Sequence, residues 1–159
     1  MAYYFSYDAS IPNYVETEGF YTKEELHCTL AYSRKDLTEE QLHKVHSISI
    51  PAEESATITN IDIFNNHIVL LINNSSLIQT NKKILKDFSI TEDHKERQMH
   101  VSINKGFKNN AINLEDLEKE YIGQTILLHS PKLIIKDIVT KEKNIISLIS
   151  QNNKLKLKP

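Results

Sequence analysis

Two short stretches of the sequence place a histidine and a hydroxyl residue two positions apart within an alternating apolar frame. The first, LHCTL, contains His27 and Thr29, and the second, MHVSI, contains His100 and Ser102. Residues two positions apart in a strand lie on the same face, about 6.6–6.8 Å from each other. Each histidine would therefore share one strand face with its hydroxyl partner, while the flanking apolar residues occupy the other face.

This pair of residue types suits the cleavage of a phosphodiester without a metal. The reaction needs a base for the nucleophile and an acid for the leaving oxygen, and histidine, with an ordinary pKa near 6.5, can do either. Two histidines on opposite sides of one phosphate can divide these tasks. The hydroxyl groups can donate hydrogen bonds to the non-bridging oxygens, where negative charge develops. We therefore interpret His27, Thr29, His100 and Ser102 as candidate catalytic residues.

The spacing alone does not establish this chemistry. A His-x-[Ser/Thr] step is expected about once by chance in a chain with seven histidines, and the alternative is two solvated strand faces. Only His27 and His100, 100 − 27 = 73 residues apart, have such a step, and both fall in predicted strands, one in each half of the chain. The strand context gives the pair its weight.

Length and composition predict one domain, residues 1–150, followed by a polar tail, 151–159. The chain has 159 residues, 40% hydrophobic and 25% charged, which is ordinary for a globular protein. The net charge of −2 provides no basic excess for binding long nucleic acid. A small phosphate ligand needs only a local positive patch and remains possible. Composition leaves the oligomeric state open.

Several other classes of protein are disfavoured by missing sequence features. The single cysteine, Cys28, rules out an intramolecular disulfide, and no Cys/His spacing predicts zinc. With three glycines there is no phosphate-binding glycine loop. The first residues, MAYYFSYDAS, lack the features of a signal peptide, and no apolar run reaches the roughly 18 residues of a membrane helix. We expect a cytoplasmic protein without metal, cofactor or membrane contact.

Periodicity and turn residues predict an α+β fold, because helices alternate with strands that can pair antiparallel. Helices are expected at 36–47, with Thr38 in a capping box, at 73–88, capped by Ser75 or Ser76, and at 113–123, between Asn113 and Gly123. Strands are expected at 2–7, 25–32, 55–64, 68–72, 99–107, 125–141 and 144–150, with a break near Pro131.

Strict alternation along residues 25–32 also assigns the remaining side chains of the first motif strand. Cys28 would lie between Leu26 and Leu30 as a small buried apolar residue. Tyr32 would lie on this same face, opposite His27, and pack in the core.

The stretches HCT and HVS resemble the paired His-x-[Thr/Ser] signature of the two-histidine (2H) phosphoesterases. The resemblance extends over most of the chain in length, motif spacing and element order. It implies a bilobed α+β fold, in which two antiparallel sheets with flanking helices surround a central groove and the motifs face each other. Ser102 stands where threonine is commoner in the family, but serine can donate the same hydrogen bond.

Within that family, IPN upstream of LHCTLAYSRK is similar to phage anti-CBASS phosphodiesterases, which degrade cyclic oligonucleotide immune signals. The resemblance implies cleavage of 3′–5′ bonds in a small cyclic di- or trinucleotide and a role in phage counter-defence, in the host cytoplasm. Two alternatives remain open. One is a phosphodiesterase acting on 2′–5′ oligoadenylates or on RNA ends with a 2′,3′-cyclic phosphate, and the other is a non-catalytic module that sequesters cyclic nucleotides.

Further residues are candidates for contacting the substrate. Tyr14 and Phe64 could stack on bases, although packing in the core is the alternative for both. Lys105 and Arg34 follow the motif strands and could bring positive charge to the phosphates, where solvated side chains are the default. Related phage enzymes use an acidic residue late in the chain to contact a base, and Asp137 is the corresponding candidate here.

Overall fold

The computed structural model describes residues 1–92, 98–104 and 112–148. Seven strands and three α-helices, with one short 3₁₀ helix, follow each other along these residues. The elements are β1 (Ala2–Ser10), η1 (Lys23–Glu25), β2 (His27–Ser33), α1 (Glu39–Lys44), β3 (Glu53–Phe64), β4 (His67–Asn73), α2 (Ser75–Asp87), β5 (His100–Ser102), α3 (Leu114–Tyr121), β6 (Thr125–Lys136) and β7 (Lys143–Ser147). The predicted α+β class is confirmed.

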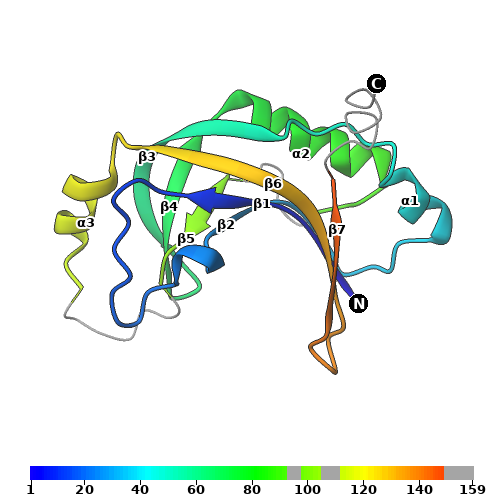
Figure 1. Cartoon of the computed structure of the whole chain (residues 1–159), viewed down its shortest axis with the longest axis horizontal. Coiled ribbons are helices and arrows are strands. Elements are labelled where there is room, and N and C mark those ends of the chain that lie inside the picture. The colour runs from blue at the N-terminus through cyan, green and yellow to red at the C-terminus, as the bar shows by residue number, and fades with distance from the viewer. Residues whose placement is uncertain (93–97, 105–111, 149–159) are drawn as a thin grey trace, which may run out of the picture.

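All the strands belong to one antiparallel sheet, in the order β1-β2-β5-β4-β3-β6-β7. The long strand β6 pairs with β1 along one edge, and with β3 and then β7 along the other. Because β6 contacts both β1 and β3, six strands form a closed ring, and β7 continues beyond it as one arm of a hairpin. The resemblance implied two antiparallel sheets. In the structure, hydrogen bonds join the strands into one continuous sheet (Figure 1).

The hydrophobic core is built from the apolar face of every strand in this ring. Alternation along each strand directs these side chains to the same side of the sheet. Fully buried members from five strands are Tyr7, Cys28, Leu70, Val101 and Leu128. Burial of Cys28 between Leu26 and Leu30 agrees with the sequence prediction.

Helix α2 contributes its own apolar stripe to this core. Leu77 and Ile84 are fully buried, and Phe88, just after the helix, packs its ring 5.0 Å from the ring of Phe5 on β1. Asn81 of α2 donates a side-chain hydrogen bond to the backbone carbonyl of Leu30 at 2.6 Å. The helix therefore fixes β2, the strand of the first histidine motif, through apolar packing and through this polar contact.

Replacing Phe88 with alanine is expected to lower the free energy of unfolding by about 3–5 kcal/mol, because it leaves a cavity between α2 and β1. Chemical denaturation followed by circular dichroism measures this loss. A matched Ile78→Ala change, at an exposed position on the same helix, should have a much smaller effect. A loss below about 1 kcal/mol for Phe88→Ala would contradict the packing described here.

The helix ends follow local capping rules in most cases. Thr38 forms the predicted capping box with Gln41, Asn113 caps α3, and Gly123 lies just beyond α3 with a φ of 93° that favours glycine. The cap of α2 differs from the prediction, because the side chain of Asn74 accepts the hydrogen bond from Ser76. Asparagine is as good a cap as serine and stands one position earlier.

Two irregularities change what strict alternation predicts. Strand β6 does not break at Pro131 but continues through it, with a register shift opposite β1 and a positive φ at Ser130. Strand β2 carries a second irregularity. Phe5 pairs with Ala31 and Ser6 with Thr29, so Leu30 is an extra residue in β2.

This bulge at Leu30 overturns the prediction for Tyr32. One extra residue reverses the alternation beyond it, so Tyr32 lies on the same face as Thr29 and His27 instead of the opposite one. The side chain of Tyr32 is half-buried and stands beside Tyr4 of β1, with 4.8 Å between ring centroids. The bulge thus adds a tyrosine to the face that carries the histidine motif.

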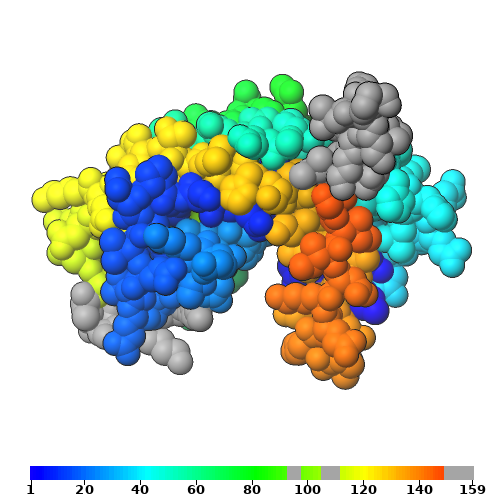
Figure 2. Space-filling view, viewed as in Figure 1, coloured from blue at the N-terminus to red at the C-terminus, as the bar shows by residue number. Residues whose placement is uncertain are grey.

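The β6–β7 hairpin forms one end of the sheet, where β1 pairs with β6 as far as Lys136. Figure 1 shows its turn pointing away from α2. In the space-filling view, an open hollow separates this hairpin, in orange, from the surface built by residues 10–30, in blue (Figure 2). Within the described ranges, no helix is long and apolar enough to span a membrane.

Candidate active site

The two histidine motifs lie side by side on neighbouring antiparallel strands. Cys28 of β2 pairs with Val101 of β5, which places Thr29 opposite His100, and His27 opposite Ser102. Directly opposite residues have Cβ atoms about 4.5–5.5 Å apart, and diagonal ones are about 7–8 Å apart. The two histidines occupy one diagonal of this square and the two hydroxyls the other. The structure therefore brings together all four candidate catalytic residues.

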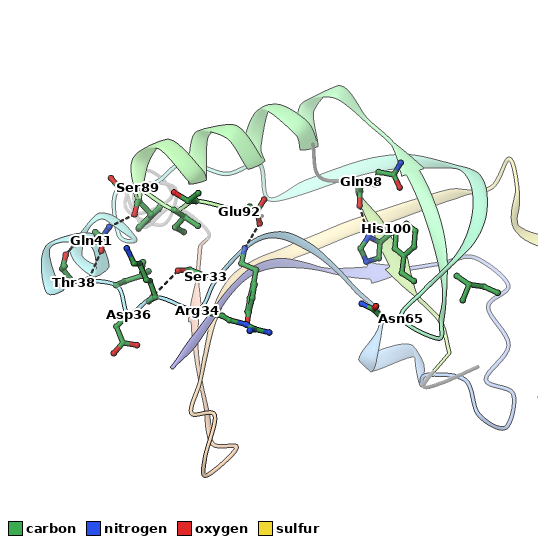
Figure 3. Close-up of a pocket in the computed structure, with 18 residues that line it drawn as sticks. Ser33, Arg34, Asp36, Thr38, Gln41, Asn65, Ser89, Glu92, Gln98 and His100 are labelled. Atoms are coloured by element: carbon green, nitrogen blue, oxygen red, sulfur yellow. Dashed lines mark hydrogen bonds between the residues drawn. The ribbon is translucent and has the colours of Figure 1, made fainter. Parts of the chain in front are cut away.

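Both histidine rings are held by the same local hydrogen bond. Nδ1 of His27 lies 2.9 Å from the carbonyl oxygen of Glu25, and Nδ1 of His100 lies 2.8 Å from that of Gln98 (Figure 3). A carbonyl oxygen only accepts, so each ring donates from Nδ1. Nε2 is then the nitrogen that takes up or releases a proton. The two motifs are equivalent in this respect, which suits a base and an acid acting on one group.

The two rings differ in their surroundings. His27 is exposed, whereas His100 is half-buried and meets the ring of Phe64 edge to face, with 5.3 Å between centroids and an interplanar angle of 86°. This geometry is favourable for aromatic pairs and limits rotation of the His100 ring. Phe64, a candidate stacking residue, thus lies beside one candidate catalytic histidine.

A small recess of about 210 Å³ adjoins the hydroxyl of the first motif. Tyr4, Thr29, Tyr32 and His100 line it. Burial, with a smaller contribution from neighbouring Tyr32, raises the pKa of the Tyr4 hydroxyl, so this group stays protonated and can donate a hydrogen bond. Tyr4 did not emerge from the sequence, because its place beside Thr29 depends on the pairing of β1 with β2.

A larger hollow of about 1520 Å³ extends from His100 toward the end of β2 (Figure 3). Arg34 lines it and donates from Nε to the hydroxyl of Tyr32 at 2.9 Å, with its guanidinium 6.0 Å from the centre of that ring. The carboxylate of Glu92 accepts from the backbone N–H of Tyr32 at 3.1 Å and from Asn81 at 3.2 Å. Through these contacts, Glu92 connects α2 to the end of β2.

The other candidate binding residues lie elsewhere. Tyr14 is 4% exposed, donates to the carbonyl of Tyr21 at 2.6 Å and packs near Tyr121, so the core alternative describes it. Asp137 begins the β6–β7 turn, where its carboxylate accepts from the backbone N–H groups of Val139 and Thr140, which lower the pKa of the carboxyl. Lys105 lies outside the described residues.

The fold is shared with solved structures of low sequence identity. A protein described as a phosphoesterase has a TM-score of 0.59 at 13% identity, over 94% of this chain and 99% of that one. LigT of E. coli complexed with 3′-AMP gives a TM-score of 0.55 at 12% identity, over 91% and 93% of the two chains. A protein of Thermus thermophilus gives 0.58 at 11% identity, over 95% and 100%.

Sequence comparison adds nothing to this likeness, because no family model and no curated protein matches the chain. At 11–13% identity, the similarity to these structures shows a common fold that extends over nearly the whole of each chain.

Proposed function

We propose that this protein is a metal-independent phosphodiesterase of the two-histidine type. The observation that carries the proposal is the square of side chains formed by His27, Ser102, Thr29 and His100 on paired strands. Both Nδ1 atoms donate to backbone carbonyls, so Nε2 of each ring is the nitrogen that would exchange a proton in the chemistry that the sequence motifs suggest. The fold shared with a phosphoesterase supports the assignment.

In the proposed reaction, a ribose 2′-hydroxyl attacks the adjacent phosphorus. One histidine, neutral at Nε2, takes the 2′-hydroxyl proton as the new P–O bond forms. The P–O5′ bond breaks, and the second histidine, protonated at Nε2, gives its proton to the departing oxygen. Thr29 and Ser102 donate hydrogen bonds to the non-bridging oxygens as their negative charge increases. The product ends in a 2′,3′-cyclic phosphate.

The proposed substrate is a small cyclic di- or trinucleotide with 3′–5′ bonds, and the proposed role is phage counter-defence against CBASS immunity in the host cytoplasm. The similarity of IPN and LHCTLAYSRK to phage anti-CBASS enzymes supports this choice. The net charge of −2 favours a short ligand over long nucleic acid. The aromatic recess beside Thr29 is suited to a base next to the scissile phosphate.

A second substrate class is an RNA end with a 2′,3′-cyclic phosphate, or a 2′–5′ oligoadenylate. It is favoured by one comparison, since LigT, whose fold is similar, has been crystallised with 3′-AMP, a nucleotide with a phosphate at the 3′ position. The same four side chains would serve, because the chemistry at phosphorus is closely related.

Incubation with 3′,3′-cyclic GMP–AMP in the presence of EDTA tests the proposal. We expect linear product in EDTA, and the same rate after magnesium is added back. A panel with 2′–5′ oligoadenylate and RNA carrying a 2′,3′-cyclic phosphate, analysed by chromatography, identifies the substrate class. Cleavage of only the latter two would overturn the cyclic-dinucleotide assignment, and tight binding of every ligand without turnover would instead indicate sequestration.

A further inference from the structure

A row of apolar side chains leads away from the candidate catalytic residues, across four strands. Tyr32 pairs with Tyr4, Tyr4 with Ile134, and Ile134 with Ile145. Residues paired across a sheet share one face, so this row lies on the face that carries Thr29. Ile145, at its outer end, is 62% exposed, and the other three are half-buried. The row begins at the recess beside Thr29 and continues onto the β6–β7 hairpin.

Two lysines stand next to this row, on the same face. Lys136 pairs with Lys143, each two positions from an isoleucine of the row. Like charges directly opposite each other destabilise a sheet. In the parts of the chain that the structure describes, neither lysine has a carboxylate within salt-bridge distance. Lys132, on the other side of the row, differs, because Asp8 lies 2.7 Å from its Nζ.

The surroundings are open enough for a ligand to reach this surface. The hairpin forms one wall of the hollow visible in Figure 2. In Figure 3 the labelled side chain of Arg34 points away from α2, and its contact with Tyr32 places a further positive charge at the inner end of the row. Apolar side chains flanked by cations match a nucleotide, which has a flat base and a charged phosphate.

We infer that this surface is a subsite for the second nucleotide of the substrate, an inference that rests on the proposed function. The base contacts Tyr4, Ile134 and Ile145, and the Lys136–Lys143 pair binds a phosphate other than the one being cleaved. On β1, Ser6 pairs with Thr29, and Ala2 pairs with Lys136. Ser6 and Ala2 are four residues apart on the strand, so Thr29 and the lysine pair are separated by about 13 Å along the strand direction. The flexible four-carbon side chains of the two lysines can extend over part of this distance. A mononucleotide, with one phosphate, cannot occupy both positions, whereas a cyclic di- or trinucleotide carries a further phosphate for the lysines to bind.

The test compares two substrates in one variant, Lys136→Glu with Lys143→Glu. For 3′,3′-cyclic GMP–AMP we expect KM to rise at least about tenfold, while KM for 2′,3′-cyclic AMP changes less than about twofold. The control is Lys82→Glu with Lys119→Glu, which makes the same charge change on exposed faces of α2 and α3 and should leave both KM values unchanged. Equal effects on both substrates, or no effect on either, would overturn the subsite.

A substitution that alters no charge tests the apolar row independently of the long-range electrostatic attraction of the lysines. Ile145→Ser should raise KM for the cyclic dinucleotide at least about threefold, and Ile78→Ser, at an exposed position on α2, should not. No change for Ile145→Ser would remove the row from the subsite. Far-ultraviolet circular dichroism confirms that each variant folds.

Binding distinguishes a failed subsite from a failed function. If the protein cleaves neither substrate, His27→Ala is titrated with 3′,3′-cyclic GMP–AMP by calorimetry, with and without the lysine changes. Binding that weakens at least about tenfold in the lysine variant supports the subsite even though the proposed catalysis fails. Unchanged binding, or none in either protein, overturns the subsite.

Discussion

Replacing either His27 or His100 with alanine is expected to lower kcat by about 10²–10⁴-fold, because each change removes one partner in proton transfer. The loss should be in kcat, with KM nearly unchanged, since the proton moves in the transition state. Steady-state kinetics on 3′,3′-cyclic GMP–AMP, in EDTA, measures both constants. The expected losses are similar for the two variants, as their Nδ1 atoms are held in the same way.

The double variant and the pH profile distinguish catalysis from indirect damage. If the two rings act on one phosphate, the double variant should lose little more than the worse single one. The wild-type rate should show a bell-shaped dependence on pH, because one ring must be neutral and the other protonated. Each single variant should lose one limb of the bell. A rate that rises steadily from pH 5 to 9 would contradict the two-histidine mechanism, as would a variant with full activity.

A loss of folding stability would not explain the expected loss of activity in His27→Ala. This side chain is exposed, and its ring bonds only to the backbone of Glu25 in the interactions described above. Changes at exposed positions usually alter stability by less than about 0.5 kcal/mol. His27→Ala should therefore unfold at nearly the wild-type denaturant concentration. An inactive variant with native stability would point to the chemistry at Nε2.

The faces of the motif strands could be predicted from the sequence, because alternation is a local property. LHCTL and MHVSI each assign their histidine and hydroxyl to one face whatever the strands pair with. That β2 and β5 are neighbours in the sheet could not be predicted in the same way. It depends on hydrogen bonds between segments 73 residues apart, and no local pattern encodes which strands become neighbours or in what register. The resemblance to a known family implied two motifs that face each other across a groove, whereas the structure places them on neighbouring strands of one sheet.

Tyr32 shows how a β-bulge makes a prediction from strict alternation wrong. Leu30 looks like any apolar strand residue, yet it is the extra residue of a bulge, and the face of every later residue in β2 is reversed. Tyr14 shows the opposite limit. An aromatic residue in a loop can stack on a ligand or pack in the core, and its burial against Tyr121 depends on α3, more than a hundred positions later in the chain.

Removing the hydroxyl groups is expected to produce the second large effect on activity. Thr29→Val and Ser102→Ala should each lower kcat by about 10²–10³-fold, the usual loss for one donor to a developing negative charge. Valine keeps the shape of threonine, so Thr29→Val tests the hydrogen bond and not the packing. The matched control is Thr29→Ser, which keeps the hydroxyl and should retain activity within about tenfold.

The square of side chains makes this prediction specific. Because the strands are antiparallel, Thr29 stands opposite His100 and Ser102 opposite His27, so each histidine has the hydroxyl of the other motif as its neighbour. Both hydroxyls should therefore matter to a similar degree, although one is a threonine and the other a serine. If Thr29→Val loses activity while Ser102→Ala does not, only one hydroxyl donates to the phosphate. The two motifs would then divide the work unequally, with Ser102 filling space beside His27.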